Sequence, residues 1–161
     1  DQARKLTLDF VCLRDGATPV LSVTLDLEAP PHSGQTHSAF DLIGRFFDLT
    51  QAYRFGPPGH DVAIARLRDE AGQVLAEAFH FPGPRLQTPE APGLEARLEG
   101  NLLSLSTVKF LPSLWIEAPG FQSSDNGFQL APGAEKRVVL SGMGGPTGRV
   151  RAPGGRILAT F

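Results

Sequence analysis

The stretch FQSSDNGFQLAPG, residues 121–133, places a run of turn-forming residues between two phenylalanines. Asn and Asp tolerate left-handed backbone conformations, and their side chains bond nearby main-chain amides. Gly127 accepts a positive φ without steric cost. Phe128 and Leu130 then alternate as inward residues of a strand, and APG predicts the next turn. The stretch therefore predicts a tight, self-bonded corner in an all-β fold. This turn motif consists of Ser124, Asp125, Asn126, Gly127 and Phe128.

Short alternating segments lie on both sides of this corner. From residue 94 to the end, about seven such runs in ~80 residues are parted by turns at intervals of ~8–12 residues, which is immunoglobulin-like spacing. Upstream, residues 6–12 and 21–27 alternate in the same way, and residues 61–81 predict a hairpin around EAG. The stretch AFDLIGRFFDL, residues 39–49, is compatible with either a strand or a helix.

A proline-rich segment separates the two alternating regions. Residues 82–93, PGPRLQTPEAPG, contain four prolines and few apolar residues. Proline lacks the backbone donor that a sheet requires, so this segment predicts a connection. We therefore predict two immunoglobulin-like antiparallel β-sandwiches in tandem, at residues 1–82 and 94–161, with a linker at residues 83–93. One larger sandwich is the alternative.

Composition narrows the class of protein. Hydrophobic residues make up 41% of the 161 residues and charged residues 20%, which suits a packed core. The net charge of −2, from 15 basic and 17 acidic residues, argues against a nucleic-acid partner. No apolar run reaches the ~18 residues of a membrane span, so we expect no membrane partner. We expect a soluble protein of the bacterial cytoplasm or periplasm, and the sequence leaves the compartment open.

The sequence offers few candidates for catalytic, cofactor-binding or metal-binding residues. The single cysteine, Cys12, excludes a disulfide framework, and its alternating strand predicts a buried thiol. His32 and His37 share a loop, but their five-residue offset matches no common zinc spacing. The run SGMGGPTGRV lacks the glycine spacing and the helix of a dinucleotide fingerprint. We predict no catalytic, cofactor or metal residue. Trp115 and Tyr53 are the candidates for a sugar or interdomain contact.

The run WIEAPGFQSSDNGFQLAPGAEKRVVL, residues 115–140, resembles the C-terminal β-sandwich of glycoside hydrolase family 2 enzymes of the β-mannosidase branch. Those domains typically carry a Ser-Asp-Asn-x-Phe-x-Leu-x-Pro-Gly run. Residues 49–85 are similar to the hairpin and exit of the immunoglobulin-like domain that precedes it. This chain departs from the pattern at FQSSDN, where many relatives carry Gly-Arg-Phe before the motif. The matching positions are Ser124, Asp125, Asn126, Phe128, Leu130, Pro132 and Gly133.

The resemblance implies a role without catalysis. Members of that family hydrolyse terminal β-mannosides with two glutamates on a central (β/α)8 barrel. A barrel takes ~250 residues and alternates strands with helices, which this chain does not do. The resemblance thus implies the non-catalytic C-terminal accessory region of a β-mannosidase, which packs on the catalytic barrel and supports it. An independent carbohydrate-binding module for mannoside glycans is the alternative, and an unrelated enzyme is a third.

Overall fold

The computed structural model describes residues 3–50, 59–83 and 86–161. Within these residues the chain is built of antiparallel strands, apart from the short helix α1 (Ala39–Ile43) and one turn of 3-10 helix (Pro153–Gly155). The predicted all-β, antiparallel fold class is confirmed. The chain divides into two compact units, Asp1–Pro84 and Arg85–Phe161.

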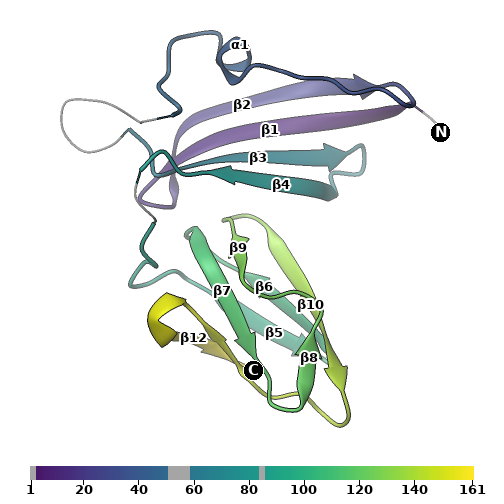
Figure 1. Cartoon of the computed structure of the whole chain (residues 1–161), viewed down its shortest axis with the longest axis vertical. Coiled ribbons are helices and arrows are strands. Elements are labelled where there is room, and N and C mark those ends of the chain that lie inside the picture. The colour runs from purple at the N-terminus through teal and green to yellow at the C-terminus, as the bar shows by residue number, and fades with distance from the viewer. Residues whose placement is uncertain (1–2, 51–58, 84–85) are drawn as a thin grey trace. The chain divides into compact units, whose positions relative to one another are not determined.

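The first unit holds one four-stranded sheet among the described residues, in the order β2-β1-β3-β4 (Figure 1). Its strands are β1 (Arg4–Arg14), β2 (Thr18–Ala29), β3 (Val62–Asp69) and β4 (Val74–His80). The hairpin expected at residues 61–81 is the pair β3 and β4, whose turn is closed by the side chain of Asp69, which accepts from Gln73 N at 2.8 Å.

Period-2 alternation gives this sheet one apolar face. The strand register places Leu8, Leu25 and Leu67 side by side on that face. Where the face reaches the buried Cys12, the segment around α1 covers it, with Phe47 and Leu49 packed onto the sheet. Within the described residues this segment, and no second sheet, forms the covering layer of the first unit.

The ambiguous stretch at residues 39–49 forms α1 and an extended segment. The helix ends after a single turn because Gly44 adopts a left-handed conformation, with φ of 64°, and its N–H donates to Phe40 O. Glycine is the residue that takes this position most readily, which is how helices commonly terminate. Burial raises the pKa of the neighbouring core thiol, Cys12, to about 11, so the thiol is neutral and suited to packing.

The second unit is a sandwich of two four-stranded antiparallel sheets (Figure 1). The first sheet has the order β5-β6-β10-β8, and the second has the order β12-β11-β7-β9. The strands are β5 (Glu95–Glu99), β6 (Leu102–Ser106), β7 (Leu111–Glu117), β8 (Phe121–Ser123), β9 (Phe128–Leu130), β10 (Glu135–Gly142), β11 (Arg149–Arg151) and β12 (Ile157–Thr160).

Alternate residues of both sheets fill the core between them. The buried members of this core are Leu103, Leu105, Leu111, Leu114, Ile116, Phe128, Leu130, Val138, Leu140 and Val150. The intervening residues face outward and are mostly polar, which is the pattern of a sandwich layer. No helix in the described part of the chain is long and apolar enough to cross a membrane.

Candidate functional site

The predicted corner is the crossing between the two sheets of the second unit. Residues 124–127 lead from β8, which pairs with β10, to β9, which pairs with β7. At the first end Ser124 forms two hydrogen bonds with one residue of β10. Its N–H donates to Val139 O at 2.8 Å, and its hydroxyl accepts from Val139 N at 3.0 Å. The serine therefore extends the ladder of the first sheet by one position.

At the other end Asn126 is bonded to β7. Its Oδ1 accepts from Ile116 N at 2.8 Å, and its Nδ2 donates to Ile116 O at 3.0 Å. This pair of bonds is the one that a neighbouring strand would supply. Gly127, with φ of 72°, then donates its N–H to Leu114 O at 2.9 Å. The asparagine side chain thus takes the place of a missing strand residue.

A lysine joins the corner to the opposite sheet. Lys136 of β10 forms an ion pair with Asp125 at 2.5 Å, and its ammonium lies 5.0 Å from the centroid of the Phe128 ring. The hydrogen bond from Lys136 lowers the pKa of the Asp125 carboxyl below its usual value. Long lysine side chains commonly pack their stems on apolar surface in this way. The polar groups of the motif are therefore used in holding the two sheets together.

Trp115 lies on the outer face of the second sheet and is 52% exposed. Its ring lies so close to Gly127 that a Cβ there would sit 3.3 Å from its Cζ2. Arg151 of β11 lies opposite Trp115 in the strand register, and it shares the carboxylate of Glu117 with Arg149. Hydrogen bonds from these two arginines lower the pKa of Glu117. Trp115 is thus fixed at a surface position with charged neighbours, and its partner candidate, Tyr53, lies outside the described residues.

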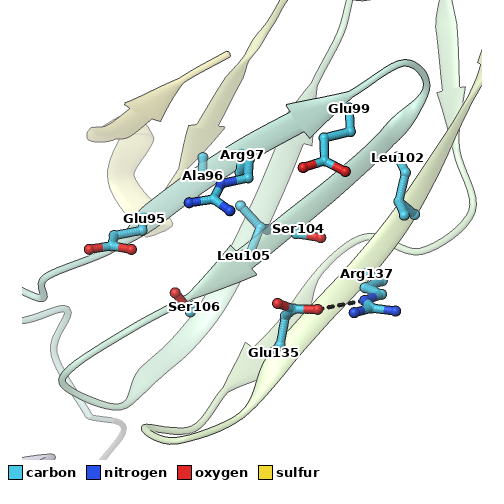
Figure 2. Close-up of a pocket in the computed structure, with 10 residues that line it drawn as sticks. All are labelled: Glu95, Ala96, Arg97, Glu99, Leu102, Ser104, Leu105, Ser106, Glu135 and Arg137. Carbon is cyan, nitrogen blue, oxygen red and sulfur yellow. Dashed lines mark hydrogen bonds and ion pairs between the residues drawn. The ribbon is translucent and has the colours of Figure 1, made fainter.

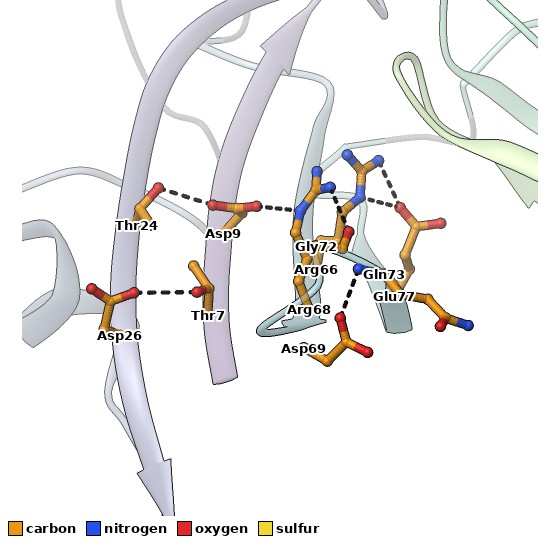
Figure 3. Close-up of polar contacts among 10 residues, drawn as sticks. All are labelled: Thr7, Asp9, Thr24, Asp26, Arg66, Arg68, Asp69, Gly72, Gln73 and Glu77. Atoms are coloured by element: carbon orange, nitrogen blue, oxygen red, sulfur yellow. Dashed lines mark hydrogen bonds and ion pairs between the residues drawn. The ribbon is translucent and has the colours of Figure 1, made fainter. Parts of the chain in front are cut away.

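A row of charged groups crosses the polar face of the first unit's sheet (Figure 3). Asp9 accepts from Thr24 Oγ1 at 2.9 Å and from Arg68 Nε at 2.8 Å, and Arg66 pairs with Glu77 at 2.7 Å. Burial alone would raise the pKa of Asp9, but these hydrogen bonds outweigh it and the pKa is lowered. Every one of these five side chains has a partner on a neighbouring strand. The row accordingly stabilises the sheet, as cross-strand pairs do.

A hollow of about 670 Å³ lies on the outer face of β5, β6 and β10 (Figure 2). It is lined on one side by Glu95, Arg97 and Glu99 of β5, and on the other by Glu135 and Arg137 of β10. Its size falls within the range of ligand sites, which is roughly 300–1,000 Å³. This hollow, which we call the β6 trough, was not predicted from the sequence. The charges at every second residue of β5 were the sequence feature that could have indicated a charged face there.

His60 is, with Cys12, a buried titratable group of the first unit. It is 1% exposed, and its ring centroid lies 5.3 Å from that of Phe47. Burial lowers the pKa of His60 more than the Leu49 backbone and the carboxylates of Asp61 and Asp48 raise it. A neutral imidazole packed on an aromatic ring contributes to the core, and no group of three potential metal ligands lies together in the described ranges.

We expect the first unit to lose stability as the pH falls below about 6.5, the value of an unfolded histidine. Because the pKa of His60 is lower when folded, the unfolded chain binds more protons, so the free energy of unfolding falls by at most ~1.4 kcal/mol per pH unit. Carboxylates with lowered pKa values, such as Asp9, lose their contribution only at more acidic pH, near or below ~4. Urea denaturation between pH 8 and 5 measures the effect, and His60→Phe should flatten it. Equal stability of the wild-type unit at pH 7.5 and 5.5 would contradict this.

A comparison with models of protein families and with curated protein sequences finds no match for this chain.

Proposed function

We propose that this chain is the non-catalytic C-terminal accessory region of a β-mannosidase-type glycoside hydrolase, whose whole enzyme hydrolyses terminal β-D-mannosides. In this proposal the chain packs on the catalytic barrel and supports it. The observation that carries the proposal is the bonding of the Ser-Asp-Asn-x-Phe motif. Its serine and asparagine bond the backbones of Val139 and Ile116, which suits a motif that serves architecture.

The outer face of β12-β11-β7-β9 supports a role in packing against a larger body. Two large apolar side chains are exposed there, Trp115 at 52% and Ile157 at 51%, and Arg151 lies between them in register. Tryptophan and arginine are the residues that most often dominate the energy of protein interfaces. The face is therefore suited to burial against the barrel.

Two measurements test the proposal. We expect the purified chain to leave aryl β-mannosides unhydrolysed, and turnover that copurifies with the chain through several columns would contradict this. We also expect the chain, added to the barrel of a β-mannosidase whose C-terminal domains were removed, to raise the barrel's melting temperature. Trp115→Ala should reduce this rise, because the loss of an interface hot spot costs ~2 kcal/mol or more of binding free energy. A control substitution, Thr18→Ala in the first unit, should not.

An independent carbohydrate-binding module is the second candidate function. The exposed ring of Trp115, beside the planar groups of Arg151 and Glu117, favours it, because an aromatic face flanked by hydrogen-bonding groups suits the ring of a sugar. Binding of manno-oligosaccharides by the chain alone, lost in Trp115→Ala, would favour this function over the accessory role.

A further inference from the structure

The strand register arranges the outer face of the first sheet of the second unit in rows. Ser106 of β6 lies between Glu95 and Glu135, and Ser104 of β6 lies between Arg97 and Arg137. Each small serine on the central strand is therefore flanked by two long side chains of the same charge. Figure 2 shows the serines along β6 with these charged side chains on either side.

This arrangement makes a trough along β6. Short side chains form its floor, and the long side chains of β5 and β10 form its walls. Since the walls stand on strands two positions apart, their backbones are separated by roughly 10 Å, twice the strand spacing. The third row continues the trough with Leu102 on the floor, beside Glu99 and the half-exposed Val139. One end of the trough is thus apolar and the rest is polar.

Three charged groups in the wall have no partner in the part of the chain that the structure describes. Among the described residues, Glu95, Arg97 and Glu99 form no side-chain hydrogen bond and no ion pair, whereas Arg137 on the opposite wall pairs with Glu135. The β10 pair is engaged within its own strand, whereas the three β5 side chains are exposed to solvent at the edge of the trough. These groups are available to a ligand.

The chemistry of the walls selects the ligand. Carboxylates only accept hydrogen bonds and guanidinium groups only donate them, so the walls offer both donors and acceptors. An anionic polymer would be repelled by the three carboxylates of the walls, and a cationic polymer would be repelled by the two arginines. A neutral chain whose every hydroxyl both donates and accepts satisfies both sets, and its C–H faces suit the apolar end at Leu102.

We propose that the β6 trough binds a neutral oligosaccharide, laid along β6, with Arg97 and Glu95 bonding its hydroxyls. The inference rests on the proposed function only for the choice of a β-linked manno-oligosaccharide as the first probe. A neutral peptide laid in the trough, or a sugar bound at Trp115 instead, is an outcome of the test that would overturn it.

The experiment is titration of the full chain with mannotetraose, followed by calorimetry and by amide NMR shifts. We expect saturable binding in the millimolar range or tighter, with the largest shifts along β6. Arg97→Gln should weaken binding about tenfold, the loss expected for one hydrogen bond to a charged group. Ser104→Tyr should abolish binding by filling the floor, and tyrosine is well accommodated in a strand. Each variant is first shown to be folded by its melting temperature.

Matched controls separate the alternatives. Arg149→Gln removes the same charge on the other sheet, where Arg149 lies opposite Glu117 and shares its carboxylate with Arg151, and should leave the affinity unchanged. The inference fails if wild-type chain shows no binding of mannotetraose or cellotetraose up to about 10 mM, if a neutral tetrapeptide binds as well, or if Arg149→Gln weakens binding while Ser104→Tyr does not. None of these results bears on whether the chain stabilises a catalytic barrel. The proposed function is therefore tested separately, by the melting temperature of the barrel.

Discussion

Phe128→Ala is expected to unfold the second unit or to leave it only marginally stable. The ring is 8% exposed, packs in the core between the two sheets, and lies under the ammonium of Lys136. Truncation of a buried phenylalanine typically costs ~3–5 kcal/mol. Domains of this size commonly have only ~5 kcal/mol or somewhat more in total. One substitution thus removes most of the free energy that keeps the unit folded.

Tryptophan fluorescence during urea denaturation measures this loss. Trp115 is the only tryptophan of the chain and belongs to the second unit, so its signal reports that unit alone. The matched control is Met143→Ala in the second unit, where the side chain is 95% exposed and the change should stay within ~0.5 kcal/mol. A Phe128→Ala midpoint equal to that of the wild type would show that this ring does not fill the core as described.

The alternation of apolar residues was sufficient to predict the fold class, because a period of two gives a strand one buried and one exposed face. The composition of residues 124–127 was likewise sufficient to predict a corner, since these residue types bond their local backbone. The stretch at residues 39–49 was not assignable, because five helical residues give too short a pattern to distinguish periods, and Gly44 ends the helix before the pattern repeats.

Contacts between distant residues could not be read from the chain. The pairing of Lys136 with Asp125 depends on how two sheets face each other, and no local pattern encodes that. The β6 trough depends on register: a shift of β5 by one residue would turn Glu95, Arg97 and Glu99 into the core and Ala96 and Leu98 outward. The charges were visible in the sequence, whereas their arrangement around two serines required the sheet.

Asn126→Ala is expected to destabilise the second unit by ~2–6 kcal/mol. The substitution removes both bonds to Ile116, whose backbone N–H and C=O then lose their partners at a residue that is only 5% exposed. Each buried polar group left unpaired costs ~1–3 kcal/mol. Asn126→Asp should destabilise too, because a carboxylate keeps the acceptor for Ile116 N but has no donor for Ile116 O.

The same variant distinguishes architecture from ligand binding at the corner. The control is Gln129→Ala, an exposed position on the adjacent β9, which should leave the urea midpoint within ~0.5 kcal/mol of the wild type. If the corner serves architecture, Asn126→Ala lowers the midpoint, and whatever fraction remains folded binds mannotetraose with unchanged affinity. If stability were unchanged and saccharide binding were lost, Asn126 would contact the ligand. The bonds to Ile116 favour the first outcome, because both polar atoms of the amide are already engaged within the sandwich.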